Sequence, residues 1–353
     1  MKSRQLFKNF LTFYCSQVYH KIRLYNGGMI ELQRCSDKEQ WDDYILENGG
    51  HPLQLWGWGQ VKSGHGWKAE RIFAYDEDTI VGAAQILIRR LPTPFKSFAY
   101  IPRGPIVDPV HSAEVLNSLA DLVKRNHHSV ALSIEPDELD FEIPEGWVRS
   151  ENKILSAETI LLDLRKSESD LLADMAKKTR QYIRKSDADV VIKQVRNREG
   201  IDVCLDLYDQ TSKRAGFNTH DRQYYLDVFL QMQDHSPIYI AYDGDEPVAF
   251  LWLAISEKTG YELYGGMNER GQELRANYAL KWHVMKKVKE WGLERYDFGG
   301  LVAGGVATFK QGWSADSTLF IGTFDKPLSP LYSIWTKGLP FAKKTLQQVR
   351  RRK

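Results

Sequence analysis

The decapeptide IFAYDEDTIV, residues 72–81, decides how the rest of the chain is interpreted, because a similar decapeptide, YIAYDGDEPV, occupies residues 239–248. Five positions are identical at a constant offset of 167 residues. Each copy is an apolar run that breaks at an acidic turn and then resumes, which is typical of a β-hairpin. The same offset carries a predicted helix at 112–126 onto 279–293 and a predicted strand at 130–135 onto 297–302. We therefore predict an internal duplication.

Each half of the chain has the same order of predicted elements: two helices, antiparallel strands, a helix and a strand. The first helix begins at the capping box SDKE, which starts at Ser36. This order predicts an α/β (α+β) fold of two acyltransferase-like domains. The predicted segments are a basic extension at 1–28, domains at 29–150 and 151–325, and a basic amphipathic helix at 326–353.

Length and composition agree with two globular domains. The chain has 353 residues, of which 42% are apolar and 12% aromatic, so it is too apolar to be disordered and too long for one ordinary core. No apolar run approaches the ~18–20 residues that a membrane span needs. The scattered cysteines, Cys15, Cys35 and Cys204, form no metal-ligand spacing, so they argue for a reducing compartment and against a metal site.

Charge is segregated along the sequence. The formal net charge is +2, but residues 1–28 carry +5 and residues 337–353 carry +7, so the body between them carries −10. Basic ends on an acidic body suit an anionic surface, either phospholipid or nucleic acid, and solvated tails are the alternative. The aromatic, basic N-terminus lacks a secretory cleavage site, and Trp335 marks a C-terminal helix that lies either on a membrane or on the protein body.

Several catalytic patterns are absent. There is no GxSxG and no GxxxxGK[ST]. The pair His127-His128 resembles the start of HHxxxD, but Leu132 stands where the aspartate is needed. An acetyl-CoA site would need a glycine-rich turn before the main helix, and this region reads RANYAL with Tyr278 in place of glycine. We therefore expect no cofactor.

Five motifs occur in a distinctive order. They are WxWxQVK from Trp56, YIPRGPIVDP from Tyr100, TSKRAGF from Thr211, YELYGG from Tyr261 and YDFGG…FKQGW from Tyr296. Together they resemble the Fem-type (FemABX) aminoacyltransferases over roughly residues 30–325. The resemblance implies two tandem GNAT-like domains. Some members carry a coiled-coil arm, but no sustained heptad is visible here, so we expect none.

The resemblance also implies a function in peptidoglycan synthesis, cell-wall biogenesis and cell shape. The expected reaction moves an amino acid from aminoacyl-tRNA to the stem-peptide amine of a cell-wall precursor, building an interpeptide bridge. The acceptor would be UDP-MurNAc-pentapeptide or its lipid-linked form. We expect a cytoplasmic monomer, with peripheral contact at the inner face of the membrane through its basic termini.

The candidate catalytic residues follow from the chemistry of ester aminolysis. This reaction needs alignment, a neutral amine and stabilisation of an oxyanion, but no covalent nucleophile. Lys310 is the candidate for the oxyanion or the adjacent tRNA phosphate, and Phe309 for the tRNA end; the alternative for Lys310 is a solvated surface residue. Asp108 is either the base that orients the amine or a turn aspartate before Pro109.

Other residues are candidates for substrate binding, with core packing, capping or a solvated face as the alternative in each case. Arginines suit bidentate phosphate recognition and tyrosines supply hydroxyls on rigid rings. The candidates for the nucleotide or lipid diphosphate and the peptide are Lys62, Tyr100, Arg103, Arg214, Tyr225, Tyr261 and Tyr264. The candidates for tRNA phosphates, on one basic helix, are Lys177, Lys178, Arg180 and Arg184.

Two other functions remain open at this point. One is an acyl-CoA-dependent N-acyltransferase of the same fold, against which the missing glycine turn argues. The other is a catalytically silent module that binds tRNA or membrane through its basic ends.

Overall fold

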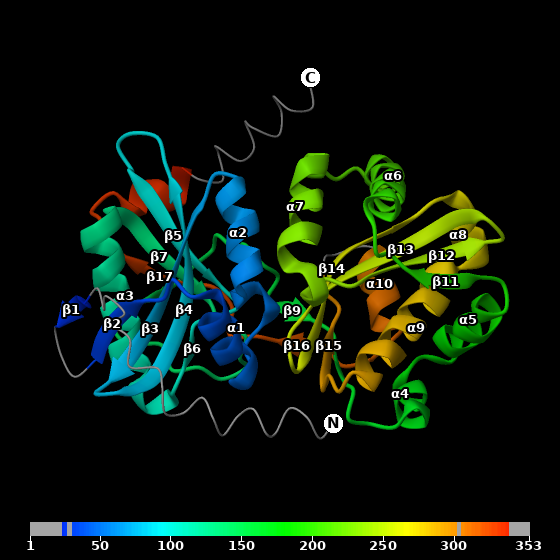
Figure 1. The fold of residues 1–353 in the computed structure, drawn as a ribbon, viewed down its shortest axis with the longest axis horizontal. Coiled ribbons are helices and arrows are strands. Elements are labelled where there is room, and N and C mark those ends of the chain that lie inside the picture. The colour runs from blue at the N-terminus through cyan, green and yellow to red at the C-terminus, as the bar shows by residue number, and fades with distance from the viewer. Residues whose placement is uncertain (1–22, 27–29, 302–304, 339–353) are drawn as a thin grey trace.

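The computed structural model describes residues 23–26, 30–301 and 305–338. These residues form two mixed sheets with helices on both faces of each, and the two layered units lie side by side (Figure 1). A short ribbon of β9 (Glu158–Thr159) and β16 (Thr318–Leu319) joins them. No helix in these described ranges is long and apolar enough to cross a membrane.

The first sheet has the strand order β1-β2-β3-β4-β5-β7-β17-β8, with β6 paired to β4. Strands β5 and β7 are parallel, and the other pairs are antiparallel. The strands are β1 (Arg23–Asn26), β2 (Ile30–Arg34), β3 (Lys68–Asp76), β4 (Thr79–Arg90), β5 (Ser97–Pro102), β6 (Ile106–Val107), β7 (Ser129–Glu135), β8 (Val148–Arg149) and β17 (Phe324–Pro327).

The second sheet has the order β10-β15-β14-β13-β12-β11. Its one parallel pair among the described strands, β14 and β15, corresponds to β5 and β7 of the first sheet. The strands are β10 (Leu161–Asp163), β11 (Val191–Gln194), β12 (Ile238–Asp243), β13 (Glu246–Ile255), β14 (Thr259–Met267) and β15 (Arg295–Asp297).

The structure repeats at the predicted offset. Strands β3 and β4 close a hairpin at Asp76 and Thr79, and β12 and β13 close one at Asp243 and Glu246, 167 residues later. The register of the first hairpin shifts after Ala74 and that of the second after Ala241, again 167 residues apart. A shared irregularity at the same place supports the predicted duplication, because bulges are specific local features.

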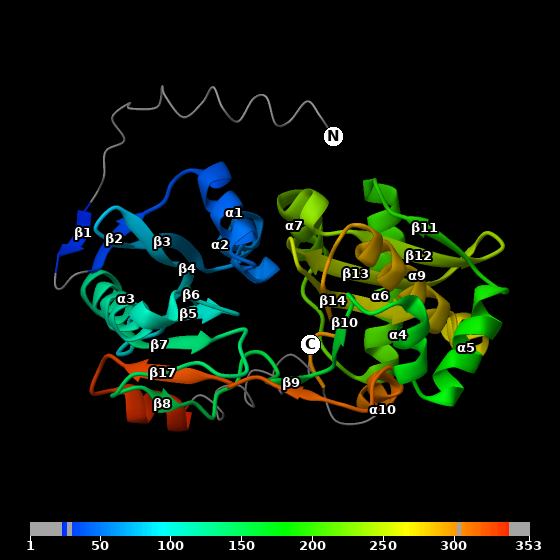
Figure 2. The same ribbon diagram turned by 90° about the horizontal axis from the view of Figure 1, so that it is seen from below.

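The helices cover the sheets from both sides. Helix α3 packs against one face of the first sheet, α1 and α2 lie on its other face, α6 and α7 face them from the second domain, and α5 and α9 cover the far face of the second sheet (Figures 1 and 2). The helices are α1 (Lys38–Glu47), α2 (Trp56–Gly64), α3 (Ser112–His127), α4 (Glu168–Asp174), α5 (Lys177–Asp187), α6 (Arg198–Ala215), α7 (Arg222–Met232), α8 (Glu269–Leu274), α9 (Ala276–Glu290) and α10 (Gly305–Gln311), with 3-10 turns η1 (Pro52–Gln54), η2 (Pro109–His111) and η3 (Gln233–His235). The longest described helix, α6, has 18 residues, so this part of the chain contains no coiled-coil arm.

One hydrophobic core spans both domains. It joins Trp41 and Trp58 of the first domain to Tyr224 and Trp252 of the second. Helices α2 and α7 meet closely at Gly57, where an added Cβ would lie 2.3 Å from the carbonyl oxygen of Gln231. Burial of this much aromatic surface favours a fixed arrangement of the two domains.

Three boundaries differ from the sequence-based expectations. The N-cap of α1 is Asp37 rather than Ser36, since the Asp37 carboxylate accepts from the backbone of Glu39 and Gln40. Residues 23–26, expected in the N-terminal extension, pair with β2 as strand β1. Residues 324–327, expected at the junction of the second domain and the C-terminal helix, return to the first sheet as β17, which pairs with β7.

The C-terminal helix begins after β17, and residues 332–338 are helical. Its Trp335 ring packs against Phe95 and Phe98, with ring centroids 5.4 and 6.0 Å away. The described part of this helix therefore lies on the first domain, while Ile334 is 60% exposed. Most of the predicted basic tail lies outside the described residues.

Candidate active site around Lys310

Lys310 lies on α10, shortly after the turn that ends β15. Its ammonium donates hydrogen bonds to the carbonyl oxygens of Phe298, at 2.5 Å, and Gly300, at 2.7 Å. An ammonium group has three N–H donors, and the third has no partner among the described residues. Lys310 is therefore held in place and retains one donor for a ligand. The sequence placed it after a glycine loop, and the structure adds that Phe309 and Lys310 belong to a short helix.

The turn before α10 depends on a glycine. Gly299 has φ 75°, and an added Cβ would lie 2.4 Å from the carbonyl oxygen of Glu262 on β14. Only glycine fits such a close approach in the left-handed region. The turn thereby presses the end of β15 against β14 and aims the two carbonyl groups at Lys310.

Charged groups surround Lys310 from three elements. Glu262 on β14 pairs with Lys281 on α9 and accepts a hydrogen bond from the Tyr296 hydroxyl at 2.8 Å. Burial lowers the pKa of Lys310, whereas the negative charge of Glu262 raises it. Lys281 lowers that pKa further, and Asp297 on β15 raises it. The balance of Glu262 and Lys281 thus controls the protonation of Lys310.

Phe309 is half-buried within a group of aromatic rings. Its ring centroid lies 5.0 Å from that of Tyr278 and 6.1 Å from that of Trp313. The ammonium of Lys281 lies 5.7 Å from the same ring. Phe309 therefore packs between α9 and the active-site turn, and part of it stays accessible.

Asp108 makes the local contacts expected of a turn aspartate. Its carboxylate accepts a hydrogen bond from the backbone N–H of Val110 at 3.0 Å and caps η2. The side chain is 50% exposed. The capping alternative is thus present in the structure, and a role as base stays a prediction.

Arg103 lies in the interior between the domains. It has φ 47° and is 3% exposed, its Nη2 donates to the carbonyl oxygen of Ser156 at 3.1 Å, and its guanidinium covers the Phe320 ring at 4.3 Å. Asp297 lies near it, and burial raises the pKa of that carboxyl while Arg103 lowers it. Because Asp297 directly precedes Phe298, Arg103 connects the domain interface to the backbone that holds Lys310.

Four buried polar atoms near Arg103 have no hydrogen-bond partner among the described residues. They are Arg103 Nε, His51 Nε2, Asp137 Oδ1 and Asp297 Oδ2. A cavity of about 660 Å³ is lined by His51, Arg103 and Asp137 together with Arg295. Unpaired buried groups are costly, so this cavity suits a polar ligand with both donors and acceptors.

Tyr100 and Tyr261 are part of this interior. The Tyr100 hydroxyl donates a hydrogen bond to Glu135, and the Tyr261 ring meets the His51 ring edge-on at 4.8 Å. Burial raises the pKa of both tyrosines. The Tyr100 hydroxyl is therefore already engaged, whereas Tyr261 lies beside the cavity-lining His51.

Lys62, Tyr225 and Tyr264 gather where α2 faces α7. The Lys62 ammonium donates to the Tyr224 hydroxyl at 2.7 Å and lies 4.3 Å from the Trp58 ring. Burial lowers the pKa of Lys62 to about 8. The rings of Tyr225 and Tyr264 are 5.0 Å apart within the shared core. The structure thus brings these predicted residues together, with Tyr224 as an added partner.

Arg214 occupies a different place, at the end of α6. Its Nη2 donates to the carbonyl oxygen of Met267 at 3.0 Å. A cavity of about 670 Å³ beside it is lined by Lys213, Arg214 and Arg270, together with acidic side chains of which Glu246 is one. The arrangement offers several cations to a ligand but also contains carboxylates.

The predicted basic helix is α5, and three of its four candidates are exposed: Lys177, Lys178 and Arg184. Arg180 differs, because its Nη1 donates to the carbonyl oxygens of Leu172, Ala173 and Met175. This group closes the C-terminal end of α4, where unpaired carbonyls need donors. Arg180 therefore has a structural role that the helical spacing alone did not reveal.

The sequence interpretation missed Glu262, Lys281, Tyr224 and Asp297. Two of them had a local signal, since Glu262 stands between the predicted Tyr261 and Tyr264 and Asp297 belongs to the YDFGG motif. Lys281 and Tyr224 had none, because each acts through a partner on another element.

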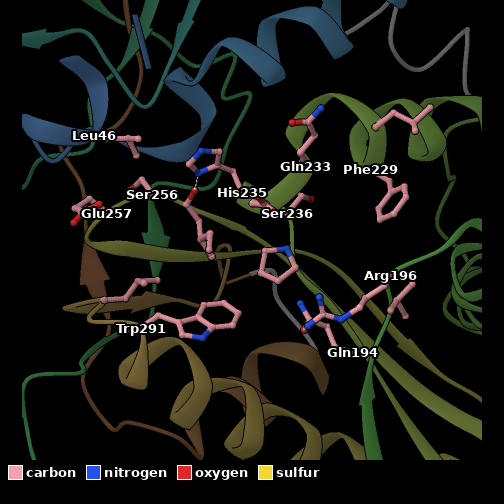
Figure 3. Close-up of a pocket in the computed structure, with 16 residues that line it drawn as sticks. Leu46, Gln194, Arg196, Phe229, Gln233, His235, Ser236, Ser256, Glu257 and Trp291 are labelled. Carbon is pink, nitrogen blue, oxygen red and sulfur yellow. Dashed lines mark hydrogen bonds between the residues drawn. The ribbon is translucent and has the colours of Figure 1, made fainter. Parts of the chain in front are cut away.

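A further cavity, of about 710 Å³, lies away from these residues (Figure 3). It is lined by α7, the strands beside it and Trp291, and a ring nitrogen of His235 hydrogen-bonds with the carbonyl of Ile255 at 3.2 Å. None of the predicted site residues lines it, so it is not part of the candidate active site.

Comparison with known proteins agrees with the geometry. Residues 37–142 match the FemAB family, and residues 173–311 match the acetyltransferase (GNAT) domain. The "Lipid II:glycine glycyltransferase" of Staphylococcus saprophyticus subsp. saprophyticus is 23% identical over 376 residues, covering 81% of this chain and 90% of the relative.

Solved structures show the same fold. FemX superposes with a TM-score of 0.77 at 20% identity, covering 86% of this chain and 99% of FemX. A tandem GNAT protein from the clavulanic acid biosynthesis pathway has a TM-score of 0.51 at 12% identity, covering 85% of this chain and 99% of that protein. With its FemAB and GNAT matches, its relatives and its two layered domains, the chain belongs to the Fem-type aminoacyltransferases.

Proposed function

We propose that this protein transfers an amino acid from aminoacyl-tRNA to the stem-peptide amine of a lipid-linked peptidoglycan precursor, and so builds an interpeptide bridge. One observation carries the proposal: the Lys310 ammonium is fixed by two backbone carbonyls and keeps its third N–H free of described partners. The relative that is named for lipid II and glycine supports the choice of acceptor and of reaction class.

The reaction is aminolysis of an ester. The neutral stem-peptide amine attacks the ester carbonyl, and the new C–N bond produces a tetrahedral oxyanion. The C–O bond to the tRNA ribose then breaks, and the amine proton passes to the departing oxygen. Lys310 stabilises the oxyanion with its third N–H, because a preorganised charged donor in a partly buried site favours developing negative charge.

The acceptor fits the interface between the domains. We assign its diphosphate to the cations near the ends of α2 and α6, Lys62 and Arg214, and its peptide to the cavity beside Arg103. The unpaired donors and acceptors around that cavity match the mixed polarity of a peptide. Tyr261 and Asp108 lie at the same interface, where the attacking amine would be oriented.

The donor fits the opposite face of the second sheet. Lys177, Lys178 and Arg184 on α5 are exposed, and no described carboxylate forms an ion pair with them at the distances found elsewhere in the structure. Uncompensated cations on one helix suit tRNA phosphates. Lys310 would then lie between a donor that enters from α5 and an acceptor that enters from the domain interface.

The test is reconstituted transfer. The protein is incubated with individual aminoacyl-tRNAs and with either the lipid-linked precursor or the UDP-linked muropeptide, and products are weighed by mass spectrometry. We expect a mass increase of one amino-acid residue or more with the lipid-linked acceptor, abolished by ribonuclease treatment of the donor. A product only with the UDP-linked form would correct the acceptor, and no product with any charged tRNA and either acceptor would overturn the function.

A further inference from the structure

A row of aromatic rings leads from α5 to the active-site lysine. The ring of Tyr182 on α5 lies 5.1 Å from that of Tyr278 on α9, which lies 5.0 Å from that of Phe309 on α10. Phe309 directly precedes Lys310 in the sequence. The row therefore connects the basic helix to the group proposed to stabilise the oxyanion.

Cations cover the outer end of this row. The guanidinium of Arg275 lies 3.8 Å from the centre of the Tyr182 ring, and the ammonium of Lys178 lies 5.6 Å from it. Arg275, Tyr182, Tyr278 and Phe309 are all half-buried, so each leaves part of its surface accessible. Neither Arg275 nor Lys178 forms an ion pair with a carboxylate in the described part of the chain.

The position of the row in the fold is informative. Arg275 and Tyr278 belong to the turn and first residues of α9, where an acyl-CoA enzyme of this fold would present glycines to a pyrophosphate. Here Arg275 has φ 56° and precedes a helix that carries Tyr278 in its first turn. A flat ring and a guanidinium replace a backbone anion cradle, and this combination favours a ligand that has both bases and phosphates.

We propose that Tyr182, Tyr278 and Arg275 form the binding surface for the unpaired 3′ end of the donor tRNA, with bases against the rings and phosphates at Arg275 and Lys178. This inference rests on the proposed tRNA-dependent function. The two ring separations span roughly 10 Å, which corresponds to about three stacked nucleotides at ~3.4 Å each. The terminal nucleotide, which carries the ester, then lies beside Phe309 and Lys310.

Core packing between α5 and α9 is the alternative explanation of the row. Packing alone requires neither the tyrosine hydroxyls nor a guanidinium stacked on the outer ring, and the neighbouring buried residues of α5, Ile183 among them, already supply apolar contact. Nucleotide stacking makes a prediction that packing does not: the effect of the rings depends on the 3′ end of the RNA.

The experiment compares two forms of one probe. Uncharged, unfractionated bacterial tRNA is used intact or trimmed enzymatically by its 3′-terminal nucleotides, and binding to the full chain is measured by fluorescence anisotropy. We expect Tyr278→Ala and Arg275→Ala each to weaken binding of intact tRNA by roughly 5- to 100-fold and to leave binding of trimmed tRNA within about twofold. Tyr278→Phe keeps the ring and should bind intact tRNA like the native chain.

Trp291→Ala is the matched control. Trp291 is an exposed aromatic residue, 46% accessible, immediately after the other end of α9, and it lies about 20 Å along the helix from Tyr278 at ~1.5 Å per residue. Its removal should change neither binding constant. Thermal unfolding of every variant reports folding, and Arg275→Lys supplies a second variant if Tyr278→Ala does not fold.

The outcomes separate the inference from the function on which it rests. Equal losses for intact and trimmed tRNA, or no loss, would overturn the stacking surface even if transfer from aminoacyl-tRNA is observed. Failure of the native chain to bind tRNA or to transfer from it would overturn both. A parallel loss of binding to anionic phospholipid vesicles in Tyr278→Ala, without dependence on the RNA end, would assign the row to a membrane and overturn the proposal.

Discussion

Glu262 on β14 and Lys281 on α9 form a buried ion pair, with side chains only 8% and 10% exposed. Tyr296 completes the arrangement by donating to the same carboxylate oxygen at 2.8 Å. The pair lies next to Lys310 and contributes opposite effects to its pKa. It links the stability of the second domain to the protonation of the active site.

Replacing Glu262 by glutamine should shift the pH dependence of transfer. Burial already lowers the pKa of Lys310 and Glu262 raises it, so the variant loses the protonated lysine at a lower pH. The alkaline limb of the kcat profile should therefore move to lower pH, and amine labelling of Lys310 followed by mass spectrometry should show the same displacement. Glu290→Gln, at an exposed carboxylate paired with Lys287, is the control. An alkaline limb that stays in place would separate Glu262 from Lys310.

The same substitution should also destabilise the protein, because it leaves Lys281 buried without its partner. Breaking a buried pair from one side typically costs about 3–5 kcal/mol. Urea unfolding of Glu262→Gln should show a loss of this order, whereas Glu290→Gln should remain within about 0.5 kcal/mol of the native chain. Equal stability of the two variants would mean that the Glu262–Lys281 pair contributes little.

Lys310→Met should remove the oxyanion donor while keeping much of the side-chain volume. We expect kcat to fall by about 10²–10³-fold, with the KM values of donor and acceptor changed only a few-fold. Lys287→Met, at a lysine that is 41% exposed, should transfer at the native rate. If Lys310→Met instead raises the KM for tRNA and leaves kcat intact, Lys310 binds a phosphate and does not stabilise the oxyanion.

Lys62→Met should stabilise the protein near neutral pH. Burial lowers the pKa of Lys62 to about 8, so below that pH the folded state holds a charge that the unfolded state hydrates better. The native chain regains this free energy as pH rises from about 8 towards the ordinary lysine pKa, because only the unfolded state then keeps the proton. The variant should be more stable by roughly 2 kcal/mol at pH 7, and its advantage should shrink above pH 8 in urea unfolding. A constant advantage would contradict the assignment, and the KM for the acceptor should rise in parallel.

Two glycines in α2 should respond in opposite directions. A Cβ at Gly57 would lie 2.3 Å from a backbone oxygen of α7, whereas a Cβ at Gly64 would meet only Asp227 Oδ2 at 3.7 Å. Gly57→Ala should therefore destabilise the chain by about 1–3 kcal/mol, and Gly64→Ala should stabilise it by about 0.5–1 kcal/mol. Thermal unfolding compares them directly. If Gly57→Ala is neutral, α7 is free to move away from α2.

The sequence predicted those parts of the fold that depend on local patterns. The hairpins, α3 and α9 were recognised from periodicity and from the repeat, and the structure places them at the expected offset. Helix α10 was missed because GVATFKQ is short and rich in poor helix formers. Its helical form depends on contacts that lie elsewhere, namely Lys310 on Phe298 and Gly300 and Phe309 on Tyr278.

The candidate site divides in the same way. Lys310 and Phe309 stand within a motif, so the sequence identified them, and their roles stay predictions. Glu262 and Lys281 are 19 residues apart on different elements, and Arg180 acts on the end of the preceding helix. No spacing rule reports such partners, because they are chosen by tertiary packing.

Strand β17 has a consequence for how the protein is made. The first sheet receives this strand, which pairs with β7, only after nearly the whole second domain has been synthesised. The second domain enters and leaves through the adjacent strands β9 and β16, so its ends are close together and it behaves topologically as an insertion. On the ribosome, the first domain must wait with an incomplete edge while the inserted domain folds. Assembly is therefore ordered from the inside outwards, and the last step closes both domains at once.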